Sequence, residues 1–247
     1  MSFQDHFSTK AATYALARPK YPVALYDHLA RMAPGRGLAW DCGTGNGQAA
    51  VALAAHFQRV IATEPSQQQL DQATPHARVV YSCSAETAPV IRSGTADIVT
   101  SAQAAHWFDL GRFYPEVRRV LRPGGLLAIW TYGLCTVAPE VDPLILRFYT
   151  ETVGPFWPPE RKHAETGYRE LEFPFAEIGF PPLFIQMDWN AAEFTVYLRT
   201  WSAVTRYTKA NGIDPVPVFA EELSRVWGPE RRRVSWPMGG RIGRVSF

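Results

Sequence analysis

The sequence predicts an α/β fold built around a doubly wound, mostly parallel sheet, and three observations support this prediction. Short apolar runs alternate with helical patterns through the first half of the 247-residue chain. The first of these runs leads directly into a glycine-rich stretch, as the first strand of such a sheet does. Apolar residues make up 47% of the chain and charged residues only 19%, so much of it must be buried. Strands that alternate with helices pair in parallel, which leads to the doubly wound arrangement.

The first half supplies five strand candidates and three helix candidates. The strands are expected at Leu38–Cys42, Arg59–Glu64, Arg78–Cys83, Ala96–Ser101 and Leu126–Thr131, and the helices at Gln48–Phe57, Ser66–Ala73 and Asp109–Leu121. Ser66 can cap its helix because a serine oxygen accepts a hydrogen bond from a free N–H group of the first turn. Pro123, Gly124 and Gly125 end the third helix. These elements make residues 35–132 the expected ligand-binding core.

The second half has a different composition, with Pro, Trp and Phe clustered between Ala138 and Pro182. Strand candidates at Phe184–Trp189 and from Arg233 to Trp236 would complete a seven-stranded sheet, and Glu193–Lys209 and Pro215–Trp227 have helical patterns. No flexible linker separates the halves. We therefore expect a single domain over residues 1–247, in which 1–34 form an N-terminal lid segment and 133–247 complete the sheet and form a helical, aromatic-rich cover.

Charge, hydropathy and cysteine content argue against several classes of protein. The formal net charge of +2 gives no basis for nucleic-acid binding, which needs many phosphate contacts. The longest unbroken apolar run, Ala49–Ala55, has seven residues, whereas a membrane span needs about 20. The first residues show no secretory signal, and the three cysteines are far apart without metal-like spacing. We expect a cytoplasmic protein without a metal site, and the oligomeric state stays open.

A basic segment closes the sequence. Six arginines fall between Arg225 and Arg244 against one acid, Glu230. Such a segment could bind an anion or a partner. Surface arginines that flank a strand are the interpretation we favour.

The strongest functional signal is a glycine-rich loop, Asp41-Cys-Gly43-Thr-Gly45-Asn-Gly47, between the first strand and the first helix. Glycines there let a ligand approach the backbone, and the helix start offers unpaired N–H groups. Glu64 ends the second strand, 21 residues after Gly43, where an acid can accept both hydroxyls of a ribose. A tight turn with Glu64 capping the next helix is the alternative, but the complete strand–loop–helix–strand–acid order favours an adenosine ligand.

The charge of the same loop distinguishes a dinucleotide cofactor from S-adenosylmethionine. Dinucleotide folds use a third glycine at the position that Gln48 holds here. Asp41 lies two residues before Gly43, where a carboxylate would repel a pyrophosphate. The same carboxylate would attract the ammonium and sulfonium groups of S-adenosylmethionine. We therefore expect S-adenosylmethionine as the cofactor and no binding of NAD.

Five features in order along the chain resemble the class I S-adenosylmethionine-dependent methyltransferases of the small-molecule type 11 family. They are the glycine loop, Glu64-Pro65, Ser84-Ala85-Glu86, Ala96-Asp97-Ile-Val and Val120-Leu-Arg-Pro-Gly-Gly-Leu, which together span residues 35–132. Two shorter stretches, Tyr14–Pro22 and Tyr197–Ser202, are similar to the subgroup that includes trans-aconitate methyltransferases. The resemblance implies a Rossmann-like fold and methyl transfer to a small molecule.

The resemblance also implies a set of cofactor-binding residues. The glycines would face the methionine part of the cofactor, Glu64 would hold the ribose from the rim of a cleft, and residues 84–86 would line the adenine. Ser84 stands where relatives often have an acid, which makes it a weaker acceptor for the adenine amine. The full set is Asp41, Gly43, Gly45, Glu64, Pro65, Ser84, Ala85, Glu86, Gln103 and Tyr14, the last as part of a lid with Phe3 and Phe7.

Methyl transfer is an in-line displacement from a cationic sulfur, for which a protein supplies alignment and excludes water. A carboxylate acceptor needs no general base, whereas a hydroxyl or amine must lose a proton. His106 is the histidine at the carboxyl end of a strand, so it is the candidate base. Its alternative role is to pack against Trp107 or to bond the backbone.

Arginines in the outer segments suggest how an acceptor is recognised. Arg18, Arg199 and Arg206 could bind a carboxylate in bidentate fashion. Arg199 and Arg206 are seven apart and would share a helix face near Trp201, unless that face is simply solvated. Trp107 is a further acceptor-side candidate. We expect a small anionic or aromatic acceptor. A cofactor-binding protein without methyl-transfer activity and a nicotinamide-dependent oxidoreductase are the alternatives.

Overall fold

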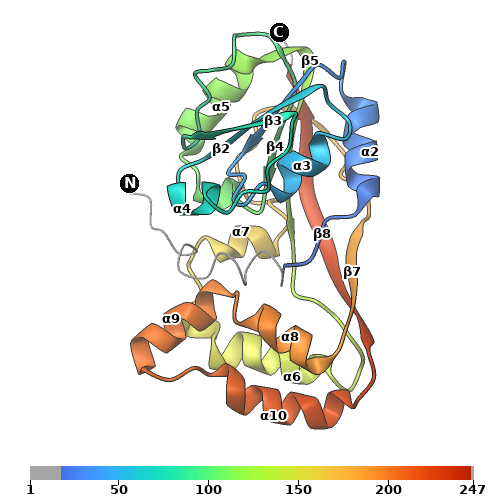
Figure 1. The fold of residues 1–247 in the computed structure, drawn as a ribbon, viewed down its shortest axis with the longest axis vertical. Coiled ribbons are helices and arrows are strands. Elements are labelled where there is room, and N and C mark those ends of the chain that lie inside the picture. Colours follow the sequence, from blue (N-terminus) through green and yellow to red (C-terminus); the bar gives the residue numbers. More distant parts are fainter. Residues whose placement is uncertain (1–17, 246–247) are drawn as a thin grey trace.

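The computed structural model describes residues 18–245, and one sheet runs through most of its length (Figure 1). The strand order is β3-β2-β1-β4-β5-β8-β6, and β7 pairs with β8 beside this path. The strands are β1 (Leu38–Cys42), β2 (Arg59–Glu64), β3 (Val79–Cys83), β4 (Ala96–Ala102), β5 (Leu121–Tyr132), β6 (Ala176–Ile178), β7 (Phe184–Trp189) and β8 (Arg232–Arg244). The strands β1 to β5 pair in parallel. The predicted doubly wound, mostly parallel sheet is confirmed, but the sheet of residues 18–245 has eight strands where seven were expected.

The chain order reverses at β1, in the centre of the parallel strands. β1 pairs with β2 on one side and with β4 on the other, with Ala39 opposite both Val60 and Ile98. Sheets of this kind bind ligands outside the carboxyl ends of the strands at such a reversal. The loops that follow β1, β2 and β4 are therefore the segments that matter for a site.

Helices cover both faces of the parallel strands. They are α2 (Val23–Met32), α3 (Gln48–Leu53), α4 (Gln67–Leu70) and α5 (Leu110–Val120). Ala39 packs on the face of α2 and α3, whereas the next residue, Trp40, packs on the face of α5, because successive side chains of a strand alternate. Leu25 and Leu29 of α2 are fully buried against the sheet, within the segment expected to be a lid. Ser66 caps α4 as predicted.

β8 is longer than the sequence indicated and pairs antiparallel with three strands. Its second half pairs with β5 and β6, and its first half pairs with β7. The predicted strand covered only Arg233 to Trp236, and β6 was not predicted. The second half of β8 is rich in glycine, and strands are recognised in a sequence by their branched and aromatic residues, so this half was not predicted. Gly240 has to be a glycine there, since a Cβ would lie 2.5 Å from the Ile129 carbonyl oxygen.

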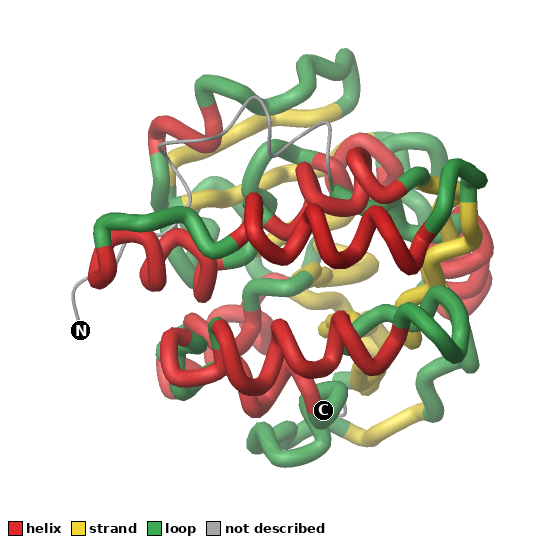
Figure 2. Tube along the Cα trace, turned by 90° about the horizontal axis from the view of Figure 1, so that it is seen from below, coloured by secondary structure: helices red, strands yellow, loops and turns green. Residues whose placement is uncertain are grey.

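Most helices of the second half gather at one end of the molecule, and the view from below shows them in front of the strands (Figures 1 and 2), whereas α7 (Arg161–Glu165) lies between them and the parallel strands (Figure 1). The others are α6 (Asp142–Arg147), α8 (Ala191–Leu198), α9 (Ser202–Asn211) and α10 (Val216–Trp227), with short 3-10 or π segments η3 (Phe148–Thr152) and η4 (Gly154–Phe156). No helix among the described residues is long and apolar enough to cross a membrane.

The single helix predicted over Glu193–Lys209 is wrong. The chain leaves helical geometry at Trp201, whose ψ of 133° is extended, and α9 begins at the next residue. Arg199 follows the end of α8 and Arg206 lies within α9. The two arginines therefore belong to separate elements and do not share the helix face that their spacing suggested.

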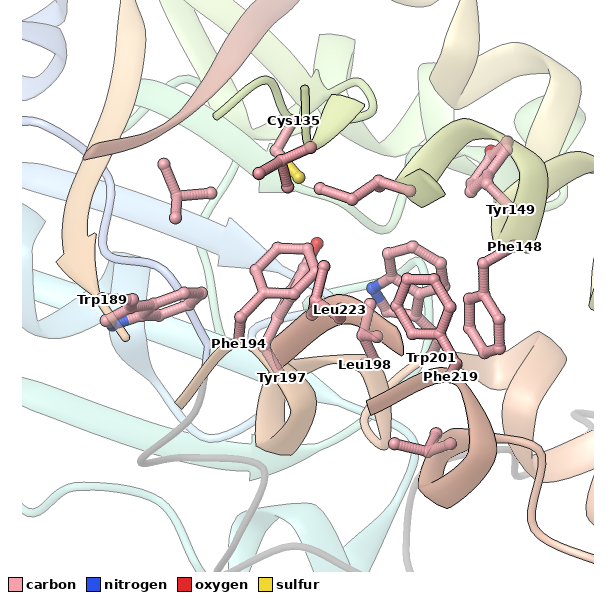
Figure 3. Close-up of a cluster of buried hydrophobic side chains, with 14 of the residues drawn as sticks. Cys135, Phe148, Tyr149, Trp189, Phe194, Tyr197, Leu198, Trp201, Phe219 and Leu223 are labelled. Carbon is pink, nitrogen blue, oxygen red and sulfur yellow. The ribbon is translucent and has the colours of Figure 1, made fainter. Parts of the chain in front are cut away.

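The cover has a hydrophobic core of its own, dominated by aromatic rings that point toward one another (Figure 3). The rings of Phe148 and Phe219 stack with centroids 4.3 Å apart, and Trp201 lies 6.2 Å from Phe148. Trp227 and Trp236 are fully buried in the same cluster. Aromatic side chains bury about 150–250 Å² each, so rings contribute much of the apolar area that is buried in the cover.

The basic end of the chain lies on and around β8, and its arginines are engaged with the protein. Arg231, Arg232, Arg233 and Arg241 form ion pairs with Glu193, Glu140, Asp188 and Glu177, and Arg244 donates to the carbonyls of Gly124 and Met32. This agrees with the interpretation of surface arginines that flank a strand. The three cysteines are free thiols.

Candidate active site

The loop after β1 is held tightly against β2. The backbone N–H groups of Gly43 and Thr44 both donate to the carbonyl of Thr63, at 2.9 and 3.0 Å. Gly43 has a φ of 68°, and a Cβ there would lie 2.6 Å from the Cβ of Ala104. The loop needs glycine at this position, both for its left-handed backbone and for its close approach to the segment after β4.

Glu64 joins the glycine loop to the end of β2. One carboxylate oxygen accepts from the N–H of Gly45 at 3.0 Å, and the other accepts from the N–H of Ser66 at 3.1 Å, across the turn that contains Pro65. The residue is only 5% exposed, so the expectation of an acid at the rim of a cleft is wrong. Glu64 supports the loop itself, because two backbone donors depend on it.

Asp41 is fully buried beneath the same loop. Its two carboxylate oxygens accept hydrogen bonds from the hydroxyls of Thr44 at 2.6 Å and Thr100 at 2.7 Å. Burial raises the pKa of Asp41 to about 6, and the two hydroxyl groups oppose this shift. Since its oxygens are buried and both accept hydrogen bonds from threonines, Asp41 lies beneath the loop and does not reach its outer surface.

The segment after β3 contains the residues expected to line an adenine. The hydroxyl of Ser84 donates to the carbonyl of Thr87 at 2.7 Å, so it is engaged within its own turn. The carbonyl of Ala85 accepts from the hydroxyl of Thr63 at 3.4 Å, which brings this segment against β2. Glu86 is 8% exposed and lies 3.4 Å from an arginine of α5. The carbonyl of Ala85 also accepts from the thiol of Cys42 at 3.6 Å, so the segment lies beside the ends of β1 and β2.

β4 ends in a residue with unusual backbone geometry. Gln103 has a φ of 57°, which few residues with a Cβ adopt. Its N–H donates to the carbonyl of Trp130 at 2.8 Å, and its side-chain oxygen accepts from the hydroxyl of Thr131 at 2.5 Å. Contacts with β5 thus hold the strained residue in place, which is typical of functional sites. The chain then enters a short 3-10 helix, η2 (Ala105–Trp107).

His106, on η2, is enclosed by α7 and neighbouring rings. Its Nδ1 lies 2.9 Å from the hydroxyl oxygen of Tyr168, and its ring lies 4.8 Å from that of Trp107. Burial lowers the pKa of His106 to about 3, and the charges of Arg161 and His163 add to this effect. The imidazole is therefore neutral near pH 7. A general base is most effective when its pKa lies near the working pH, which this histidine does not meet.

An arginine that the sequence analysis did not single out lies close enough to act on this histidine. Arg161 begins α7, which packs against η2 and β5. Its guanidinium carbon lies 4.8 Å from the centre of the Trp157 ring, and its Nε donates to the hydroxyl of Tyr149 at 3.1 Å. The side chain is 19% exposed, and Glu165 lies 3.9 Å from Nε. Within residues 18–245, its two terminal nitrogens make no hydrogen bond.

Irregular sequence explains why Arg161 was missed. It follows a stretch of prolines and aromatics that has neither helical nor strand periodicity, and its helix is only five residues long. The one signal was the cluster of Pro, Trp and Phe around it. Such a cluster indicates packing and does not say which polar residue the rings surround.

Two of the predicted acceptor-side residues lie in the same neighbourhood. Trp201 is buried, and its ring lies 5.5 Å from that of Trp157, which stacks on the missed arginine. Arg18 donates to the hydroxyl of Tyr132, the last residue of β5, at 3.1 Å. The start of the described chain is thus joined to the carboxyl end of β5.

Other predicted residues are placed elsewhere or lie outside the description. Arg199 forms an ion pair with Asp214 at 3.2 Å, and its side chain is 41% exposed. Trp107 is 36% exposed beside His106. Tyr14, like the rest of the expected lid before residue 18, lies outside the described residues.

Similar proteins agree with this architecture. The family model for a methyltransferase domain matches residues 40–129. A relative from Dictyostelium discoideum, whose name assigns it to the methyltransferases, is 35% identical over 229 residues, which cover 91% of this chain and 87% of that protein. A solved structure named for a type II methyltransferase from Anaeromyxobacter dehalogenans is 46% identical, with a TM-score of 0.86, and covers 92% of this chain and 97% of its own.

A third relative names the methyl donor. A Saccharomyces cerevisiae protein, whose name describes an S-adenosylmethionine-dependent methyltransferase, is 31% identical over 132 residues, 50% of this chain and 45% of its own. The Dictyostelium and Anaeromyxobacter matches span both halves of the sequence. The chain belongs to the class I S-adenosylmethionine-dependent methyltransferases, and S-adenosylmethionine is its cofactor.

The residues around the glycine loop fit such a cofactor. The three loop glycines have positive φ and leave the backbone without Cβ atoms at the carboxyl end of β1. Buried or nearly buried acids surround them, which suits a ligand that carries a sulfonium and an ammonium group. These acids are Asp41, Glu64 and Glu86.

Proposed function

We propose that this methyltransferase transfers the methyl group of S-adenosylmethionine to the carboxylate of a small-molecule acceptor. The observation that carries the proposal is Arg161, a largely buried guanidinium among aromatic rings whose terminal nitrogens make no hydrogen bond within residues 18–245. A guanidinium binds a carboxylate through two parallel hydrogen bonds. A covered site strengthens that pairing because the local dielectric is low.

The cofactor would lie at the carboxyl ends of β1 and β2. In the proposed arrangement Gly43 and Gly45 face its methionine part, Glu64 and the turn at Pro65 hold the ribose, and residues 84–86 line the adenine. The buried Asp41 stabilises the cationic end from beneath the loop. Gln103 shapes the backbone where the donor and the acceptor meet. The bound cofactor supplies an electrophilic methyl group on a cationic sulfur.

The low pKa of His106 favours a carboxylate acceptor over a hydroxyl or an amine. A carboxylate is already a nucleophile at neutral pH, so nothing has to remove a proton from it. His106, with a pKa of about 3, would be a weak base for a hydroxyl or amine. The charge of Arg161 that depresses this pKa would at the same time attract an anion. Burial and this charge together disfavour base catalysis, and the charge favours an anionic acceptor.

The protein's part in the reaction is alignment and exclusion of water. Arg161 would hold the acceptor carboxylate, Trp157 and Trp201 would cover it, and Arg18 would add positive charge at the end of β5. Such positioning can account for several kcal/mol of a displacement barrier, about 7–11 for well-aligned reactants. Methylation converts the carboxylate into a neutral ester, which weakens its attraction to arginine and helps the product leave.

A screen of small carboxylic acids, phenols and amines with labelled cofactor tests the proposal. We expect label to appear in a base-labile methyl ester of a carboxylic acid. For that acid, Arg161→Gln should raise KM by roughly 10- to 100-fold, since charged hydrogen bonds contribute about 1.5–3 kcal/mol each.

Arg169→Gln is the matched control, because Arg169 is an exposed arginine of the neighbouring segment whose Nε donates to the Thr166 carbonyl. It should leave KM unchanged. A preference for phenols or amines, or an Arg161→Gln enzyme with the KM of the unmodified protein, would reject a carboxylate held by Arg161. Absence of labelled product with every acceptor would favour the alternative of a binding protein without methyl-transfer activity.

A further inference from the structure

We propose that His106 acts as a neutral hydrogen-bond donor to the acceptor through its Nε2–H group, and that Tyr168 is the positioning residue that fixes this tautomer. The identity of the acceptor group, a carboxylate oxygen, rests on the proposed function. The tautomer itself follows from the contacts of Tyr168. This role is the opposite of the general base that the sequence suggested.

Tyr168 is held in an unusual conformation. Its φ is 64° and that of the preceding Gly167 is 63°, so two successive residues are left-handed. Few residues with bulky side chains adopt this conformation, and they keep it where the surrounding structure enforces it. The surroundings do so here, because Tyr168 is fully buried and the backbone of Gly167 lies against that of Gly239. This geometry delivers the phenol to the underside of η2.

The donors and acceptors around Tyr168 indicate whether Nδ1 or Nε2 of His106 carries the hydrogen. The hydroxyl of Tyr168 has one hydrogen, and its oxygen lies 2.9 Å from Nδ1 of His106. If Nδ1 carried a hydrogen and donated it, the buried hydroxyl would have to place its own hydrogen elsewhere. A buried donor without an acceptor is costly. In the proposed arrangement the hydroxyl donates to Nδ1, which leaves the imidazole hydrogen on Nε2.

The neighbours of the phenol are consistent with this direction. The backbone N–H of Ala105 lies against the Tyr168 oxygen and can only donate to it. The hydroxyl of Thr131, also near that oxygen, donates its own hydrogen to Gln103 at 2.5 Å, and its oxygen is the other acceptor within reach of the phenol. An imidazole nitrogen is more basic than a hydroxyl oxygen, which favours Nδ1 as the acceptor. Burial raises the pKa of Tyr168 well above that of a free phenol, so the hydroxyl keeps the hydrogen that it donates.

Burial, together with the charges around His106, keeps the ring neutral, so that only one of its two nitrogens carries a hydrogen. The groups that face it are Arg161 and His163 from α7, Tyr168 beneath it and Trp107 beside it. Both charged or chargeable neighbours from α7 disfavour a second proton on the imidazole. Nε2 lies on the edge of the ring away from the Tyr168 hydroxyl, and within residues 18–245 it has no hydrogen-bond partner.

Arg161 and His106 therefore have different roles toward the acceptor. Arg161 supplies the positive charge that selects an anion, and the Nε2–H of His106 supplies a directed donor beside the strained end of β4. A neutral donor can orient one carboxylate oxygen without competing with the sulfonium as a second positive charge. Alignment of that oxygen with the methyl group is what an in-line displacement needs.

Nitrogen-15 NMR of the labelled protein, free of acceptor, tests the tautomer directly. We expect His106 to show a protonated Nε2 and an unprotonated Nδ1 from pH 5 to pH 8. In Tyr168→Phe, which keeps the ring but removes the donor, this signature should change to a mixture of tautomers. A protonated Nδ1 in the unmodified protein, or a signature that Tyr168→Phe does not alter, would overturn the proposal.

Kinetics with the identified acceptor tests the role. His106→Gln keeps an N–H donor at a similar reach and should retain KM within about threefold, whereas His106→Leu should raise KM roughly tenfold, the loss of one hydrogen bond. His76→Gln, at an exposed histidine, is the control. Equal KM values for His106→Gln and His106→Leu would overturn the donor role, as would a rate that rises with a pKa between 5 and 8 and loses that dependence in both variants.

These readouts separate two kinds of failure. If the acceptor screen identifies a phenol or an amine, the proposed function fails while the NMR signature still reports the tautomer. If the signature is wrong while Arg161→Gln raises KM for a carboxylic acid, the proposed function stands and the role of His106 and Tyr168 falls.

Discussion

The glycine loop and the aromatic cover meet at the same edge of the sheet, but different interactions hold them. In the loop, carboxylates and carbonyls hold backbone N–H groups, as Glu64 does for Gly45 and Thr63 for Gly43. In the cover, rings hold one another, as Phe148 does with Phe219. Directional hydrogen bonds hold the loop backbone in one geometry. Ring contacts fill space and tolerate rearrangement.

This difference suits the two ligands. The cofactor is the same in every turnover, and in the proposed arrangement a loop of glycines binds it through the backbone. The acceptor differs between members of a methyltransferase family, and a packed group of rings around one arginine can change its shape by substitution. The comparison leads to four predictions, from the largest expected effect to the smallest.

The first asks whether the two regions are separate folding units. We propose that they form one domain, because β8 pairs with strands of both. Trp227→Ala in the cover and Phe113→Ala under the sheet each remove a fully buried ring and should cost about 3–5 kcal/mol of the free energy of unfolding. Either variant should unfold in one transition at a lower temperature by calorimetry. Two separate transitions, with only one displaced in each variant, would show two domains.

The second concerns the buried charge beneath the loop. The folded-state pKa of Asp41, about 6, lies above its unfolded value, so the folded protein binds the proton more tightly. Its contribution to stability therefore falls as pH rises from about 4 to about 6, by roughly 3 kcal/mol. Asp41→Asn should lose this slope in urea unfolding measured at several pH values. Saturating cofactor should reduce the slope in the unmodified protein, because a cation favours the charged form.

An identical slope in Asp41→Asn would mean that other groups cause it. A slope that saturating cofactor leaves unchanged would mean that the charge of Asp41 does not act on the bound cation. The loop would then attract its cofactor by shape alone.

The third tests the double role of Glu64. Glu64→Ala leaves the buried N–H groups of Gly45 and Ser66 without their acceptor, which should cost about 1–3 kcal/mol of stability. It should also weaken cofactor binding tenfold or more in calorimetry. Glu177→Ala, at a surface acid paired with an arginine of β8, is the control. A fully stable Glu64→Ala protein would restore the picture of an acid at an open rim.

The fourth concerns the basic end of the chain, where we expect the smallest effect on stability and binding. Arg233 and Asp188 form an ion pair in which both side chains are mostly exposed. Arg233→Ala should change the free energy of unfolding by less than about 1 kcal/mol, and should leave cofactor affinity and turnover unchanged. A clear loss of acceptor binding would revive the interpretation of this segment as an anion site.

The two regions also differed in how far the sequence could predict them. The loop, Glu64 and the five parallel strands were predictable because their residues act through fixed spacing along the chain. Glu64 was nevertheless expected at a rim, because spacing shows which strand end a residue occupies and not how deeply it is buried. Arg161 and Tyr168 could not be predicted. Their roles depend on which rings and helices pack around them, and that arrangement arises only in the folded cover.

Helical periodicity also had a limit in the cover. Arg199 and Arg206 have the spacing of one helix face, yet the extended backbone at Trp201 separates them. The buried ring of Trp201 explains why. Its packing against Tyr149 and Trp157 outweighs the preference of the segment for a continuous helix.

The position of β8 in the chain sets an order for biosynthesis. β8 begins 100 residues after β5 ends, and it is translated after every strand that it joins. The cofactor half can pack while the ribosome is still making the cover, since domains fold from the N-terminal side as they emerge. Until β8 arrives, however, one edge of β5 has no partner, and unpaired edges promote aggregation. The nascent protein therefore depends on timely translation, or on a chaperone, for the interval between these two strands.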